Sequence, residues 1–423
     1  MFDEPKRKPK RKRKRDESIV PYVIVFGLVI LVLVGSAGVF LLMREPQQQV
    51  CLDASAPCAT PTPLPFVLYP TSTPLMPPEM IGQYATNGVA PNISSLALAP
   101  DQQHLLVGLQ YPADSDLLGR VASLALGQSD DGRLILDEEI ASYPLVSSQL
   151  RIVDDIDIQP QNAFFSLGSL VNQTVEIYDK DAAELADAVP SPANSPIAYQ
   201  FYSDLAFSPD GRFYVIAGSS GISLRDVETL SETSHVEGSD ESYLVDMAFN
   251  STSTKLIVAQ GVMSPYLKTW YIEEDTLQES AVVTLPRQIL DIDVHPTLDQ
   301  VAVAMPGMIA IYDIDSNQLE TYIVNEAPAI SSVAYHLSGN LLVFGGSHDA
   351  VSGALYAMPL DDEGYAIFTD EQININNMGF TSGPISELLY DASGRTLFVG
   401  TTNGGLYTWD SATSQPVDQF IFE

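Results

Sequence analysis

The chain has 423 residues, of which 54 are acidic and 20 are basic, so its formal net charge at pH 7 is −34. An acidic field of this size repels nucleic acids, phosphates and acidic polysaccharides, and it attracts cations and basic partners. The composition therefore excludes nucleic acid as a partner.

The N-terminal segment differs in composition from the rest of the chain. Nine of the ten residues 6–15 are lysine or arginine, and residues 19–43 form a run of 25 without a charge. At about 1.5 Å per residue a helix of that length spans roughly 37 Å, more than the roughly 30 Å hydrocarbon core requires. Because only Arg44 directly follows the run, the positive-inside rule places the N-terminus in the cytoplasm. We predict a basic cytoplasmic tail (1–18) and a single transmembrane helix (19–43) that anchors an extracytoplasmic part at the cell membrane.

Two other interpretations of this segment are open. Gly35, Ser36 and Ala37 offer small residues at which a signal peptide could be cleaved. The apolar run continues to Met43 and is too long for an ordinary signal-peptide core, which favours an uncleaved anchor. The basic cluster has the composition of a nuclear-import or nucleic-acid patch, but its place directly before the apolar run favours a role in membrane topology and attraction to anionic lipids.

Residues 44–79 form a linker that contains nine prolines, several of them in Thr-Pro pairs. Proline at this density favours extended polyproline geometry, so we predict a semi-rigid Pro/Thr-rich stalk. The only cysteines, Cys51 and Cys58, lie in it and are predicted to form a disulfide outside the cytoplasm. Fifty of the 54 acidic residues but only ten of the 20 basic residues follow position 44, so the extracytoplasmic part carries the acidic charge.

A repeat fills residues 80–423. Each of seven copies begins with an apolar strand, continues through a turn of Pro, Gly, Asn or Ser, and returns in a second apolar run. Third strands follow, several ending in an aromatic residue beside an acid, as at Tyr312-Asp313 and Trp409-Asp410. The apolar residues that open the seven first strands are Leu96, Ile156, Leu205, Met247, Ile292, Val333 and Leu388.

A fourth strand is predicted in each copy, at residues 134–140, 183–189, 230–236, 277–283, 319–325, 365–371 and 416–422. A repeat of about 40–50 residues with four strands is typical of a propeller blade. We therefore predict an all-β fold, a seven-bladed β-propeller of four-stranded blades, whose closure removes exposed sheet edges. Either residues 416–422 or a strand at residues 80–86 could complete the last blade.

The repeats resemble those of the WD40-repeat family of β-propellers over about four fifths of the chain. Trp409-Asp410 is the dipeptide that names the family, and Ser208-Pro209-Asp210-Gly211 matches its turn. No copy has the Gly-His pair that opens a typical repeat, so the histidine-based hydrogen-bond network of the family is not expected here. The resemblance implies a divergent WD40-like propeller.

No catalytic motif stands out. The chain has no G-x-S-x-G nucleophile elbow, no Walker A motif and no H-E-x-x-H, so no catalytic or cofactor-binding residue is assigned. His295 and His336 occupy equivalent turn positions in copies five and six, which would place them on one face. A ligand site there is one interpretation, and simple repeat equivalence is the other.

Acidic residues recur directly before the first strands. The residues at this position are Ser95, Asp155, Asp204, Asp246, Asp291, Ser332 and Glu387, and those two places further on are Ala97, Asp157, Ala206, Ala248, Asp293, Ala334 and Leu389. Because first strands line the central channel of a propeller, the earlier position should form a ring. Its acids either bond loop amides or hold a cation. The candidate metal ligands are Asp155, Asp204, Asp246, Asp291 and Glu387, with calcium as the cofactor that suits oxygen ligands.

These features favour a non-catalytic function. We expect a membrane-anchored extracytoplasmic propeller that binds or scaffolds an unidentified protein or a cationic ligand. The alternative is an extracytoplasmic propeller enzyme, hydrolase or lactonase-like, with the channel acids as its polar groups. A receptor is a third interpretation, which would need a membrane partner for output because only about 18 residues would lie inside.

Overall fold

The computed structural model describes residues 90–111, 119–143, 153, 155–161, 164–169, 174–179, 184–190, 203–218, 221–237, 244–260, 264–324, 329–369 and 372–422. The predicted basic tail, transmembrane helix, linker and Cys51–Cys58 disulfide all lie outside these ranges. Among the described residues, no helix has the length and apolar character that crossing a membrane requires. This part of the chain is all-β and consists of strands and their connections.

Four consecutive antiparallel strands make up each of the first three sheets. Sheet one contains β1 (Asn92–Leu98), β2 (His104–Gln110), β3 (Gly119–Gln128) and β4 (Leu134–Tyr143). Sheet two contains β5 (Asp155–Ile158), β6 (Phe164–Ser169), β7 (Thr174–Asp179) and β8 (Glu184–Pro190). Sheet three contains β9 (Ser203–Phe207), β10 (Phe213–Gly218), β11 (Gly221–Asp226) and β12 (Glu232–Glu237).

The same order continues to the C-terminal sheet, with one insertion. Sheet four contains β13 (Leu244–Phe249), β14 (Lys255–Gln260), β15 (Tyr266–Glu273) and β16 (Thr276–Thr284). Sheet five contains β17 (Asp291–Val294), β18 (Gln300–Met305), β19 (Met308–Asp313) and β20 (Gln318–Ile323). Sheet six contains β21 (Ala329–Tyr335), β22 (Leu341–Ser347), β23 (Ser352–Pro359) and β26 (Asn376–Ser382), with a hairpin of β24 (Phe368–Thr369) and β25 (Gln372–Ile373) inserted. Sheet seven contains β27 (Ile385–Tyr390), β28 (Thr396–Thr401), β29 (Gly405–Asp410) and β30 (Gln415–Ile421).

All seven apolar residues predicted to open first strands lie in first strands, because alternating apolar runs bounded by turn residues are a local signal. The fourth strand is where predicted in every sheet except sheet six. There residues 365–371 were predicted, but β26 pairs with β23 instead. Ile367 and Phe368 are 39% and 47% exposed, whereas Met378 of β26 is 2% exposed. The apolar run at 365–371 thus belongs to the inserted hairpin, and burial against the next sheet selects β26.

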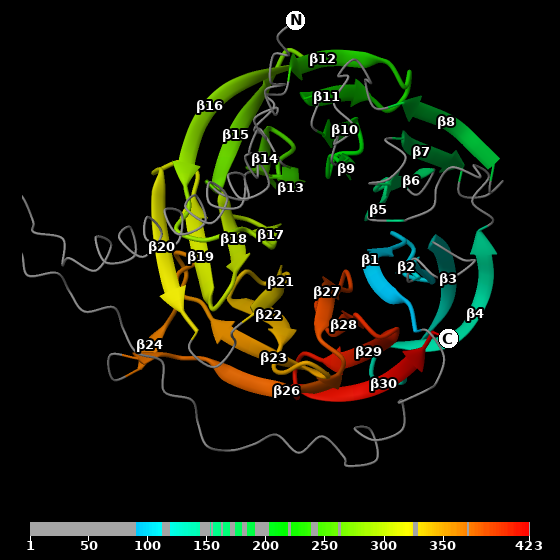
Figure 1. The fold of residues 1–423 in the computed structure, drawn as a ribbon, viewed down its shortest axis with the longest axis vertical. Coiled ribbons are helices and arrows are strands. Elements are labelled where there is room, and N and C mark those ends of the chain that lie inside the picture. The colour runs from blue at the N-terminus through cyan, green and yellow to red at the C-terminus, as the bar shows by residue number, and fades with distance from the viewer. Residues whose placement is uncertain are drawn as a thin grey trace, which may run out of the picture. The chain divides into compact units, whose positions relative to one another are not determined.

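The first strands lie around a common centre (Figure 1). Each contacts the first strand of the next sheet, from β1 through β5, β9, β13, β17 and β21 to β27, and β27 contacts β1 again. The arrangement of the described sheets is therefore propeller-like. Sheet seven is completed by β30, which pairs with β29, so residues 416–422 rather than a preceding segment supply its outer strand. Residues 80–86 lie outside the described ranges.

Hydrophobic clusters fill the spaces between neighbouring sheets. One joins the last sheet to the first, where Phe398, Leu406 and Phe422 pack with Leu105 and Val107. Complete burial of such a side chain contributes about 1.5–3 kcal/mol. The junction between the last and first sheets is thus held by packing, in the same way as the others.

Candidate functional site

The five predicted ring carboxyls come together around the centre. Asp204 is 7% exposed, and all five groups lie close enough to raise or lower one another's pKa. Burial, and then the charges of Asp291, Asp155 and Asp246, raise the pKa of the Glu387 carboxyl well above its usual range. The first strands therefore form the acidic ring that their spacing predicted. None of its carboxyls forms an ion pair with a basic side chain of the described residues.

Three of the five ring carboxyls, those of Asp155, Asp246 and Asp291, accept a hydrogen bond from the main chain of the next sheet. Asp246 Oδ1 accepts from its own following amide, Met247 N, at 2.7 Å, while Oδ2 accepts from Ile292 N at 2.8 Å. Asp291 Oδ2 likewise accepts from Val333 N at 2.8 Å. The geometry therefore supports the interpretation that the ring acids bond main-chain amides. The amides belong to the first strand of the next sheet and not to a local loop. These hydrogen bonds link adjacent sheets at the ring.

Asp157 and Asp293 repeat this pattern two residues further along their strands. Asp157 bridges Ile158 N at 2.7 Å and Phe207 N at 2.6 Å, and Asp293 has equivalent partners at 2.8 and 2.6 Å. Burial raises the pKa of both carboxyls to about 7, although their amide partners oppose the shift. Neither acid was among the predicted metal ligands. The signal in the sequence was an acidic residue at a position where the other five copies have Ala or Leu.

Two pairs of ring carboxyls lie close to each other. Burial raises the pKa of Asp155 and of Asp204, which form the first pair. Burial likewise raises the pKa of Asp246 and of Asp291, which form the second. The protonated form of these four carboxyls is therefore favoured.

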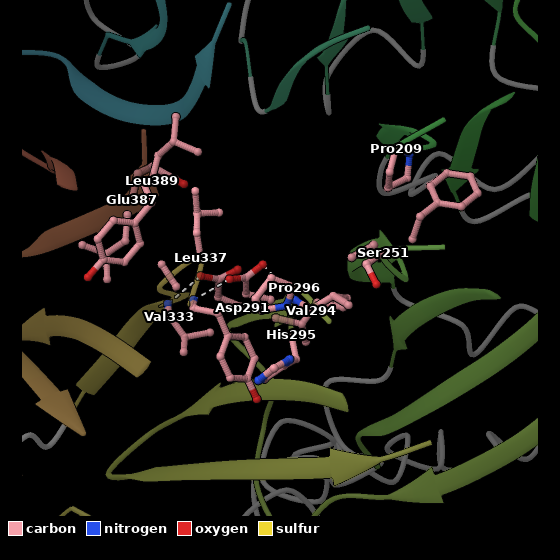
Figure 2. A pocket seen from close by; sticks show the side chains of 18 residues that line it. Pro209, Ser251, Asp291, Val294, His295, Pro296, Val333, Leu337, Glu387 and Leu389 are labelled. Carbon is pink, nitrogen blue, oxygen red and sulfur yellow. Dashed lines mark hydrogen bonds between the residues drawn. The ribbon is translucent and has the colours of Figure 1, made fainter. Parts of the chain in front are cut away.

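A cavity of about 460 Å³ opens on the side of the ring where the first strands end. We call it the turn-side cavity, because the turns after β9, β13, β17 and β21 contribute Pro209, Ser251, Pro296 and Leu337 to its wall. Figure 2 shows Pro209 and Ser251 on the side opposite Glu387 and Leu389. A second cavity of about 270 Å³ reaches Asp157 and shares Leu337, Leu389 and Tyr390 with the first. The central acids are therefore reachable from this face.

The two turn histidines each bond to the next sheet and not to each other. His295 Nδ1 accepts from Leu298 N at 2.9 Å, so Nε2 carries the hydrogen and donates to Gly339 O at 2.9 Å. His336 Nε2 makes the equivalent bond to Gly394 O at 2.8 Å. Repeat equivalence accounts for both positions, and a shared histidine ligand site is not formed. Burial lowers the pKa of His295, which favours its neutral form.

Gly339→Ala should destabilise the protein through this contact. Gly339 has φ +74°, and a Cβ there would lie 2.4 Å from the His295 ring. We expect a loss of about 1–3 kcal/mol in the free energy of unfolding, measured by urea denaturation. Gly132→Ala is the matched control, since Gly132 has φ +87° but its nearest neighbouring atom is 3.9 Å from the added Cβ. Equal losses in the two variants would show that backbone strain alone is responsible.

No group of three or more His, Cys, Asp or Glu side chains in the described ranges is arranged so that it could hold a metal ion. Calcium at the ring therefore stays a prediction. The fold and the site define an all-β, propeller-like protein of four-stranded antiparallel sheets with an acidic centre. Comparison with protein-family models gave no match, and comparison with curated proteins gave no significant one.

Proposed function

We propose that the protein is a membrane-anchored, extracytoplasmic seven-bladed β-propeller of divergent WD40 type that acts as a non-catalytic binding module. The observation that carries this proposal is the pairing of a closed cycle of first strands with a cavity at its centre. The acids around that cavity bond to main-chain amides of neighbouring sheets. Carboxyls used in this way hold a rigid frame around a binding site, which suits recognition better than turnover.

The anchoring half of the proposal rests on composition. Nine basic residues precede a run of 25 uncharged residues, and a proline-rich stretch follows. The propeller would then be held away from the bilayer by a semi-rigid stalk, with an unidentified protein or a cationic ligand as its partner.

An extracytoplasmic enzyme, hydrolase or lactonase-like, is the second candidate. It is favoured by Asp293, which lines the turn-side cavity and has a pKa of about 7, the range that suits a general acid or base. Against it, both oxygens of Asp293 already accept amide hydrogen bonds. Turnover of a lactone or glycoside by the purified chain, abolished in Asp293→Asn, would establish this candidate.

Protease added to intact cells should remove the propeller and leave a small membrane-bound fragment. The expected result follows from the basic residues before the apolar run, which retain the N-terminus inside. The fragment is detected with an N-terminal tag, and a cytoplasmic marker protein serves as the control for cell integrity. Full protection of the propeller would refute the orientation. Release of a product that begins near Gly38 without protease would instead show a cleaved signal peptide.

We also propose that the ring carboxyls Asp155, Asp204, Asp246, Asp291 and Glu387 hold a cation, with calcium as the first choice. The two close carboxyl pairs support this, because calcium prefers several oxygen ligands gathered in one place. The test is combined with the pH series in the Discussion.

A further inference from the structure

We infer that the turn-side cavity binds a primary ammonium group carried on a short alkyl chain, either as a free amine or as a lysine side chain of a partner protein. This inference rests on the proposed binding function and names the chemistry of its ligand. Three properties of the cavity support it: its acids, its apolar rim and its size.

The acids supply acceptors where the ammonium group would lie. Asp291, Asp293 and Glu387 all line the cavity, and Figure 2 shows Asp291 and Glu387 on its wall. The carboxyl of Glu387 accepts no hydrogen bond from the described residues. An ammonium group has three N–H donors and needs several acceptors at once. No lysine or arginine lines the cavity to meet this demand from within.

The rim supplies an apolar path for the alkyl chain. Leu337 is 43% exposed at the end of a turn, and Pro209, Pro296 and Leu389 line the same cavity. Leu337 also lines the smaller cavity that reaches Asp157. A ligand that enters from this face therefore passes apolar side chains before it meets the carboxyls, which is the arrangement that an amphipathic amine requires.

The size of the cavity argues for an organic cation at this position. At about 460 Å³ it lies within the roughly 300–1,000 Å³ typical of small-molecule sites. A bare metal ion would leave nearly all of this volume empty. An anionic ligand would face the acidic ring directly.

The test uses the full chain in detergent and isothermal titration calorimetry with pentylamine, N-acetyl-lysine methylamide and the neutral control pentanol. We expect both amines to bind and pentanol not to bind. Binding of the lysine derivative alone would identify a side chain of a partner as the source, and binding of pentylamine alone would identify a free amine. Equal binding of pentanol would overturn the inference, because the site would then be only apolar.

Leu337→Arg places a competing cation at the rim and should weaken pentylamine binding at least tenfold. Val351→Arg is the matched control, because Val351 is 74% exposed in the turn between β22 and β23 and lines neither cavity. Equal weakening in both variants would overturn the inference, since net charge alone would explain it. If no amine binds while protease still removes the propeller, this inference fails and the proposed function stands.

Discussion

The free energy of unfolding should fall as the pH is raised from 5 to 8. The ring carboxyls have raised pKa values, and those of Asp157 and Asp293 are about 7 against a usual 3.8. The folded protein therefore keeps protons that the unfolded chain has already lost, so the stabilisation is complete below about pH 4 and is lost as the pH rises through about 7. Since each unit of pKa shift is worth about 1.4 kcal/mol, we expect a total loss on the order of several kcal/mol. Urea denaturation at each pH measures it.

Other titratable groups oppose this fall in the free energy of unfolding but do not reverse it between pH 5 and 8. His295 has a lowered pKa, so its contribution is present above about pH 6.5 and is lost as the pH falls. It is one group set against seven carboxyls. Carboxyls with lowered pKa values, such as Asp299 and Asp313, lose their contribution only near or below pH 4. Maximum stability should thus lie near pH 4.

The same series tests calcium. Millimolar calcium should restore stability at pH 8 but have little effect at pH 5, where protons occupy the ring. Asp155→Asn combined with Asp291→Asn should remove most of the calcium effect, while Asp157→Asn should flatten the pH dependence and leave the calcium response in place. A flat profile from pH 5 to 8 in the wild-type protein would contradict the raised pKa values. If calcium had no effect at pH 8, the ring would serve only to bond the amides.

Deletion of residues 415–423 should cause the largest loss of stability. It removes β30, which exposes the edge of β29 along its whole length. It also removes Phe422, which is 3% exposed and belongs to the cluster between the last and first sheets. Loss of a buried aromatic side chain alone costs about 3–5 kcal/mol. We expect a loss of more than about 5 kcal/mol, or failure to obtain soluble protein.

Thermal unfolding of two further variants shows whether the loss of Phe422 and β30 is the cause. Removal of Glu423 alone should leave the melting temperature unchanged. Phe422→Ala should lower it by several degrees even if the longer deletion does not fold. An unchanged melting curve in the protein that lacks residues 415–423 would mean that a different strand can complete sheet seven.

The local pattern of the chain was enough to locate the strands. Apolar alternation and turn residues act over a few positions, so one apolar residue of each of the seven first strands could be located without the structure. The same reasoning found an acid directly before five of these residues and predicted that the five acids would meet at the centre. It also identified residues 416–422 as a fourth strand. What these predictions share is that each depends on one strand and its own turns.

Contacts between sheets were decided only by the tertiary structure. In sheet six residues 365–371 were predicted as the fourth strand, but β26 pairs with β23 and buries Met378 in its place. Ring acids bond amides on the next first strand, as Asp291 does with Val333 N, some 42 residues away. The raised pKa of Asp293 likewise comes from burial at the centre, which many strands create together. Such partners lie in other repeats, so their identity depends on how the sheets are placed around the centre and cannot be derived from the residues of any one repeat.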